Sequence, residues 1–200
     1  MQPTTLNRFC GVLIGAALGE PAGLVKGVQH WLTGEPPQPD IFLGDLLPVL
    51  LLHHGDPQEL ATVWPTLAQR WALTDADLRA WQTYGAFLEC ALTGQMHKAA
   101  GRPALGDSPL ALVSRTPHQP HLVLALAARI SQTYVSQVGA LLGAVHGLEG
   151  LPIHLQQSLD ERDGLLSLAR RLYGQWSGQR TDLGVPSVVT AAGRLRGLRR

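Results

Sequence analysis

Four polar side chains in the run QTYVSQ are spaced so that they can form one binding surface. Gln132 and Ser136 are four residues apart, and so are Thr133 and Gln137. On a helix, residues at this spacing lie on one face, so the run carries two adjacent pairs of hydrogen-bonding groups. Such amides and hydroxyls can hold a polar ligand, or they can satisfy one another in a buried network between helices. The sequence leaves both interpretations open.

Other residue types that often do chemistry stand in less favourable surroundings. His118 and His121 have a spacing that suits a metal, but they lie among prolines without a nearby acid or thiol, which favours an exposed loop. His146 lies between two glycines, and we interpret it as a packed, hydrogen-bonded side chain. No GxSxG sequence surrounds Ser131 or Ser136, which argues against a serine hydrolase.

Glycines at a four-residue spacing mark the elements that must position the polar run. The spacing occurs twice, at Gly139, Gly143 and Gly147 and at Gly11, Gly15, Gly19 and Gly23. Glycine in a helix interior costs about 1 kcal/mol relative to alanine, so glycines on one helical face indicate a close approach by another backbone. We therefore predict that the two segments form a tightly crossed pair of helices at the centre of the fold.

The rest of the chain also predicts helices. Asp56, followed by Pro57 and Glu59, combines an N-cap, a proline at the first helical position and a capping-box acid, and Thr74 with Asp77 forms a second capping box. By contrast, the prolines and glycines of residues 21–40 predict a surface loop with one short helix. No segment shows the alternation of a β-strand, so the fold class is expected to be all-α.

Composition and charge narrow the class of protein. With 16% charged residues and a net charge of +1, the chain offers no broad basic surface for nucleic acid. The apolar run 122–148 is interrupted by Arg129 and by several polar residues, which favours one long buried central helix over a membrane span. Cys10 and Cys90 are too few for a disulfide framework, so we expect a reduced, cytoplasmic protein.

Both glycine segments resemble motifs of the ADP-ribosylglycohydrolase family. The family motifs have the forms GxxxGxAxGDxxG and DTDTxxxxxGxxxG, and the corresponding segments here read GVLIGAALGEPAG and ISQTYVSQVGALLG. The resemblance covers roughly residues 9–55 and 122–176, and the chain is shortened between them. It implies a compact orthogonal helical bundle, with one domain over residues 1–176 and an Arg-rich tail over residues 177–200.

The resemblance also implies a site for two magnesium-type ions, and most of its acids are missing here. Where the enzymes have TDD at an early helix, only Asp45 remains. Where they have DxDT, Ile130 and Gln132 replace both aspartates and Thr133 remains, while Glu20 replaces the aspartate of the first motif. Because hard divalent cations need several carboxylate oxygens, we expect no metal cofactor. Asp45 and Thr133 are the remaining metal-ligand candidates, and Glu20 and Asp45 the remaining catalytic candidates.

The sequence therefore predicts a pseudoenzyme, a non-catalytic ADP-ribosylglycohydrolase-like protein that acts as a binding or scaffold module through a protein partner. A nucleotide or an ADP-ribose-like group is a further possible ligand, and its expected contacts are Gln132, Thr133, Ser136 and Gln137. The alternative is a diverged metal-dependent hydrolase that cleaves an ADP-ribosyl or related N-glycosidic bond. Only this alternative requires magnesium.

Overall fold

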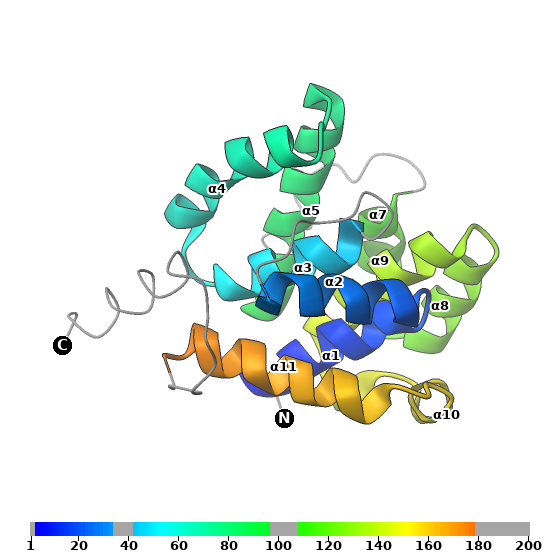
Figure 1. Cartoon of the computed structure of the whole chain (residues 1–200). Helices are drawn as coiled ribbons and strands as arrows, with labels where there is room; N and C mark the ends of the chain where they lie inside the picture. Colours follow the sequence, from blue (N-terminus) through cyan, green and yellow to red (C-terminus); the bar gives the residue numbers. More distant parts are fainter. Residues whose placement is uncertain (1–2, 34–41, 97–107, 179–200) are drawn as a thin grey trace.

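The computed structural model describes residues 3–33, 42–96 and 108–178, and within these ranges the regular structure is helical, without strands. The elements in chain order are α1 (Thr5–Ala17), α2 (Pro21–Thr33), α3 (Phe42–Leu52), α4 (Pro57–Arg70), α5 (Asp75–Leu92), α7 (Pro109–Arg115), α8 (Pro120–Ala128), α9 (Gln132–His146), a short 3-10 helix η2 (Leu148–Gly150), α10 (Ile153–Gln157) and α11 (Arg162–Trp176). They form a compact bundle, with α4 and α5 projecting from it as an arm (Figure 1). The expected all-α class is confirmed.

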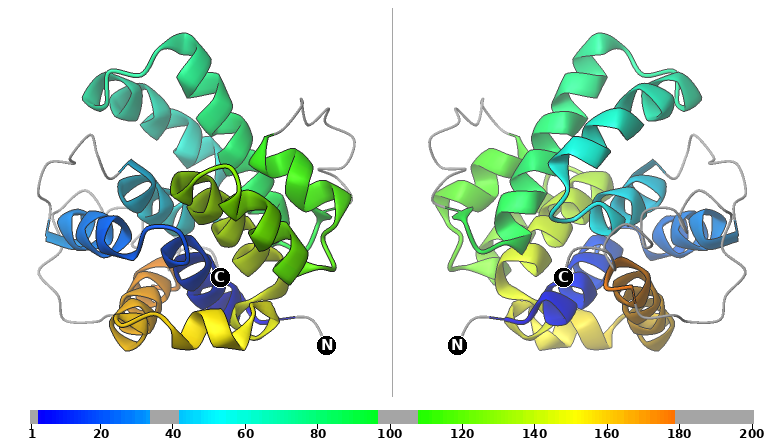
Figure 2. Two further views of the ribbon diagram at one scale, coloured as in Figure 1. Left: turned by 90° about the vertical axis from the view of Figure 1, so that its right-hand side faces the viewer. Right: turned by 90° about the vertical axis from the view of Figure 1, so that its left-hand side faces the viewer.

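Helices α1 and α9 form the centre of the bundle, side by side and antiparallel (Figures 1 and 2). Gly15 faces Gly139, and Gly11 faces Gly143, so closely that a Cβ atom on any of the four would come within 3.0 Å of backbone atoms of the other helix. The glycine spacing thus does what the sequence predicts, because it removes the side chains that would hold the two backbones apart.

Residues 21–33 correct the prediction of a surface loop, since they form the 13-residue helix α2. Pro21 occupies the first helical position, where its missing N–H is tolerated and its fixed φ suits a helix. Gly23 therefore lies in α2 and does not continue the row of glycines along α1. Its carbonyl oxygen would lie 2.8 Å from a Cβ on Gly44, and Gly44 also lies against Gly27, so a second close helix pair joins α2 to α3.

The apolar run 122–148 is a second correction, because it is two helices and not one. Helix α8 ends at Ala128, with Arg129 as its C-cap. Helix α9 begins after the N-cap Ser131, whose Oγ accepts a hydrogen bond from the Tyr134 backbone N–H at 3.0 Å. A serine N-cap satisfies one of the unpaired N–H groups of a new helix, which explains the break inside an otherwise apolar segment.

The start signals of the other helices are confirmed. Asp56 caps α4, with Pro57 at the first helical position. Thr74 and Asp77 form the complete capping box of α5. No helix in the part of the chain that the structure describes is long and apolar enough to cross a membrane. The division into a domain over residues 1–176 and a tail over 177–200 stays a prediction, because 179–200 lie outside the described ranges.

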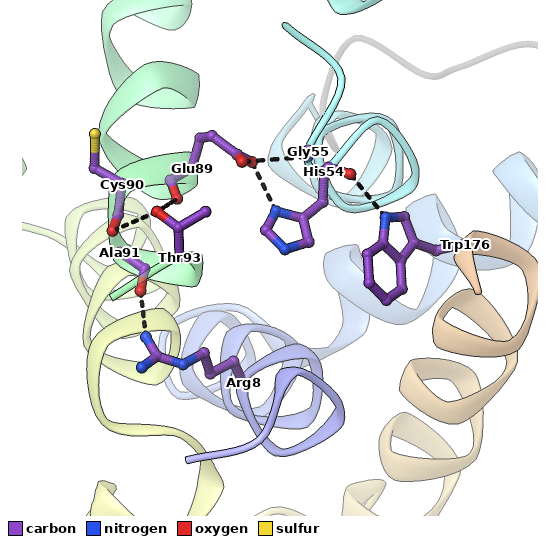
Figure 3. Close-up of polar contacts among 8 residues, drawn as sticks. All are labelled: Arg8, His54, Gly55, Glu89, Cys90, Ala91, Thr93 and Trp176. Atoms are coloured by element: carbon purple, nitrogen blue, oxygen red, sulfur yellow. Dashed lines mark hydrogen bonds and ion pairs between the residues drawn. The ribbon is translucent and has the colours of Figure 1, made fainter. Parts of the chain in front are cut away.

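Two polar clusters connect the helices around the core (Figure 3). The buried guanidinium of Arg8 donates from Nη1 to the carbonyl oxygens of Ala91 and Ala144 near the ends of α5 and α9. The Nδ1 atom of His54, after α3, lies 2.8 Å from Oε2 of Glu89 in α5. The indole Nε1 of Trp176, at the end of α11, donates to the His54 carbonyl at 2.7 Å. These contacts hold α3, α5 and α11 around the central pair.

His146 is half-buried at the end of α9, and its Nε2–H donates to the Pro117 carbonyl oxygen. Burial lowers its pKa, and the neighbouring charges of His118 and Arg8 act in the same direction, against the effect of the Pro117 hydrogen bond. The imidazole is therefore neutral in the folded protein at pH 7, as expected of a packed side chain.

The lowered pKa of His146 predicts a loss of stability in acid. Below the ordinary histidine pKa of about 6.5 the unfolded chain binds a proton that the folded chain does not, so the free energy of unfolding falls as the pH drops from about 6.5 through the folded pKa. Urea denaturation between pH 7.5 and 5 should show this slope, and His146→Gln should reduce it. An equally steep slope in the variant would assign the effect to another group.

Candidate functional site

The expected ligand-binding residues lie together at the start of α9, but they differ in accessibility. Gln132 and Thr133, in the first turn, are exposed. Gln137 is half-buried, and its backbone carbonyl accepts a hydrogen bond from the Tyr84 hydroxyl at 3.0 Å. Ser136 is only 3% exposed. The four side chains therefore do not form the buried amide network that the sequence left open, because the first helical turn projects into solvent.

Gly19 covers the inner side of this first turn. A Cβ on Gly19 would come within 3.0 Å of the Gln132 carbonyl oxygen and of the Oγ and N atoms of Ser136. The Ser136 Oγ is buried, and among the described residues it has no hydrogen-bond partner. At the start of α9, the side chains of Gln132 and Thr133 therefore face solvent, whereas the Ser136 hydroxyl is buried against Gly19.

Glu20 follows Gly19, and its chain position places it beside the start of α9. Its side chain is exposed, and its carbonyl oxygen accepts the hydrogen bond of Leu24 N–H that opens α2. The sequence analysis did not predict that Glu20 stands at the junction of three helix ends, those of α1, α2 and α9. The pair Glu20–Pro21 was the available signal, since proline at the first helical position often starts a helix.

Asp45 lies in the first turn of α3 and is only 3% exposed. The neighbouring Gly44 packs against Gly23 and Leu24, so α2 crosses directly over the start of α3. Asp45 is therefore positioned by the α2–α3 contact, whereas Thr133 is positioned by α9 and is exposed. One metal-ligand candidate is in the protein interior and the other in solvent.

These donors do not fit two divalent ions. A pair of Mg²⁺-type ions needs several carboxylate oxygens at about 2.0–2.1 Å. The positions that correspond to the family's ligands offer the buried carboxylate of Asp45, the exposed carboxylate of Glu20, the Thr133 hydroxyl and the Gln132 amide. Within residues 3–33, 42–96 and 108–178, no group of three or more His, Cys, Asp or Glu side chains is placed to hold a metal ion. We therefore derive no reaction step through a metal.

The start of α9 is better suited to hydrogen bonding with a polar group. The first N–H groups of a helix have no partner inside it and carry the positive end of the helix dipole. Ser131 satisfies only the N–H of Tyr134, and the side chains of Gln132 and Thr133 add an amide and a hydroxyl. This arrangement can bind a polar or anionic group.

A comparison with protein-family models finds a match over residues 103–182, to the family described as ADP-ribosylglycohydrolase. The resemblance to the ADP-ribosylglycohydrolases is confirmed. The match includes α7 to α11 and thus the second of the two motif segments, with Gly139 and Gly143. It does not extend to residues 9–55, where the resemblance rests on the glycine spacing in the sequence. No curated protein and no solved structure matches the chain.

Within this ADP-ribosylglycohydrolase-like chain, the altered late motif is now placed in space. Ile130, at the position of the motif's first aspartate, is 57% exposed in the turn before α9. Gln132, at the position of the second, is exposed in the first turn. The substitutions therefore leave the start of α9 accessible but uncharged.

Proposed function

We propose that this chain is a non-catalytic ADP-ribosylglycohydrolase-like protein, a binding or scaffold module that acts through a protein partner. The observation that carries the proposal is the accessible start of α9, where Ile130 and Gln132 stand at the positions of the family's two aspartates and supply no carboxylate. Both cysteines, Cys10 and Cys90, are free thiols, which supports our inference that the protein works in the reducing cytoplasm.

The proposal includes independence from a metal cofactor. Two divalent ions bring four positive charges, and the carboxylates of Glu20 and Asp45 offset at most half of them. Asp45 is also only 3% exposed, so an ion could reach that carboxylate only after a change in the packing around it. Both effects lower metal affinity, and neither is compensated by histidine or thiolate ligands at these positions.

A nucleotide or ADP-ribose-like group is the small-molecule ligand that we propose for the start of α9. Its phosphates would accept hydrogen bonds from the first backbone N–H groups, and Gln132 and Thr133 would bind its polar groups. Without a bound metal to activate water, such a ligand is held and not cleaved. A ligand bound here would lie close to Gln137 and Ser136 as well.

The alternative is a diverged hydrolase that uses magnesium to cleave an ADP-ribosyl or related N-glycosidic bond. One observation favours it: Glu20 retains a carboxylate at the position of the family's first-motif aspartate and lies beside the start of α9. In this alternative, Glu20 and Asp45 would supply the acidic groups, with Thr133 as a further metal ligand.

Calorimetric titration of metal-stripped protein distinguishes the two functions. With Mg²⁺ and with Mn²⁺, in the presence and absence of ADP-ribose, we expect no stoichiometric metal binding, because the donor set is too poor in carboxylates. Heat at a defined stoichiometry, lost in Asp45→Asn but kept in a control with the exposed Asp160→Asn, would establish a metal site and favour the hydrolase.

A further inference from the structure

The described part of the chain exposes four large hydrophobic side chains: Leu122, Leu126, Ile130 and Ile153, with exposed fractions of 44%, 37%, 57% and 59%. Leu122, Leu126 and Ile130 follow one another at four-residue spacing along α8 and the turn after it. On a helix this spacing makes a continuous stripe on one side. Single exposed hydrophobic residues are normal, but a row of them often marks an interaction site.

Ile153 belongs to the same surface because α10 begins beside the start of α8. The rings of His121 and His154 lie 5.4 Å apart, centroid to centroid, with an interplanar angle of 13°. His121 precedes Leu122, and His154 follows Ile153. We call the four hydrophobic residues the α8 patch. It lies at an edge of the molecule away from α4 (Figure 1), and its far end, Ile130, adjoins the start of α9.

The segment that contains α8 carries only positive formal charge, and Glu149, four residues before Ile153, is the first acid after it. From residue 108 to residue 148 the chain has no aspartate or glutamate. Arg115 and Arg129 are exposed there. The N-cap of α8, Gln119, makes no side-chain hydrogen bond to the helix, so the first N–H groups of α8 add a partial positive charge. An occupant of this surface must combine an apolar stripe with carboxylates.

We propose that the α8 patch docks an acidic amphipathic helix of a protein partner. The proposal rests on the proposed function as a binding module and names the partner's chemistry. A row of side chains at helical spacing packs well against the side of another helix, and Ala125, exposed between Leu122 and Leu126, leaves room for close approach. Carboxylates along that partner helix would face Arg129 at one end and the start of α8 at the other.

The charge of the surface around α8 also argues against three other occupants, namely a second copy of this chain, its own tail and a membrane. A second copy of this chain would place one acid-free α8 against another, without charge complementarity. The tail 179–200 has five arginines and one aspartate, so it has the same sign as the surface. An anionic membrane would gain only about 1 kcal/mol for each of Arg115 and Arg129, and the α8 patch has no aromatic side chain to anchor it.

Site-specific photo-crosslinking in the cells from which the gene comes tests the proposal. The full chain carries the crosslinking amino acid at Leu126, and a control carries it at the exposed Gln82 of α5. We expect a captured segment from Leu126 and not from Gln82, and sequencing of the crosslinked peptide should show an acidic segment with apolar residues at helical spacing. A synthetic peptide of that segment should bind the purified chain, more weakly at high salt, and at least tenfold more weakly to Leu122→Glu.

Several outcomes would overturn the proposal. In the crosslinking experiment, these are the absence of any captured peptide, or the capture of a basic or neutral segment, of α8 from a second copy, or of residues 179–200. In a separate experiment, flotation of the protein with phosphatidylserine vesicles, without any captured peptide, would indicate a membrane as the occupant. Because Leu122 is exposed, Leu122→Glu should fold, and circular dichroism checks this. The metal titration distinguishes failure of the docking proposal from failure of the proposed non-catalytic function. If no metal binds and no peptide is captured, only the docking proposal is overturned. If metal binds and an acidic peptide is captured, only the non-catalytic function is overturned.

Discussion

Gly139→Ala is expected to lower the free energy of unfolding by about 3 kcal/mol or more, a large part of the roughly 5–15 kcal/mol that is typical of a domain. The added Cβ would come within 3.0 Å of the Gly15 carbonyl group. A flexible side chain could turn away, but here the obstacle is backbone inside a helix, so α1 and α9 must move apart as units. Separation would also loosen the core residues on both sides of the central pair. Urea denaturation followed by circular dichroism measures the loss.

Gly164→Ala is the matched control for this substitution. Gly164 also lies in a helix, α11, and a Cβ there would meet no atom within 4 Å. Alanine should therefore stabilise the protein by up to about 1 kcal/mol through its higher helix propensity. If both variants behaved alike, the close contact between α1 and α9 would not exist in solution. Gly15→Ala, on the other side of the contact, should repeat the effect of Gly139→Ala.

The central helix pair could be predicted from the sequence because its cause is local and periodic. Glycines repeated every four residues weaken a helix unless a neighbouring backbone packs against them, and here both partners show the spacing. Helix α2 was not predicted, because the prolines and glycines of residues 21–40 suggested a loop; the helix owes its packing to contacts of Gly23 and Gly27 with Gly44, a partner distant in sequence. The break between α8 and α9 was not predicted because Arg129 and the polar residues after it were interpreted as interruptions of one buried helix, and Ser131 was not recognised as an N-cap.

The candidate site was predictable in position but not in accessibility. Helical spacing places Gln132 and Ser136 on one face, yet Gln132 is exposed and Ser136 is buried. Gly19 lies against both residues, but the nearest atoms to a Cβ there include the Ser136 hydroxyl and only the backbone oxygen of Gln132. Likewise, nothing near Asp45 in the sequence announces its burial, because α2 supplies the cover. Which side chains reach solvent depends on packing between distant segments, and this decides whether a retained acid can still bind an ion.

Arg8→Met is expected to destabilise the protein by about 2–3 kcal/mol. Arg8 is 5% exposed, and its Nη1 donates to Ala144 O at 2.8 Å. The same atom donates to Ala91 O, and this second hydrogen bond is drawn in Figure 3. Burial lowers the pKa of the guanidinium, because the charged group has lost contact with water. Removing the charge removes this desolvation penalty, which partly offsets the loss of the hydrogen bonds. Methionine fills the space but donates nothing, and the two carbonyl groups near the ends of α5 and α9 lose a donor.

Whether Arg8→Met lowers or raises the stability depends on the two carbonyl groups that lose their donor. The Ala91 oxygen also accepts a hydrogen bond from Gly94 N–H at 3.1 Å, so the Ala144 oxygen is the group most affected. A buried acceptor left unsatisfied costs about 1–3 kcal/mol, and the hydrogen bond to a charged donor is lost as well. Arg8→Lys should retain part of the stability, because the ammonium group also has several N–H donors but its shorter side chain ends short of the Nη1 position. Urea denaturation compares both variants with the exposed-site control Arg79→Met, and a stability of Arg8→Met equal to that of the control would show that the recovered desolvation cost outweighs both carbonyl contacts.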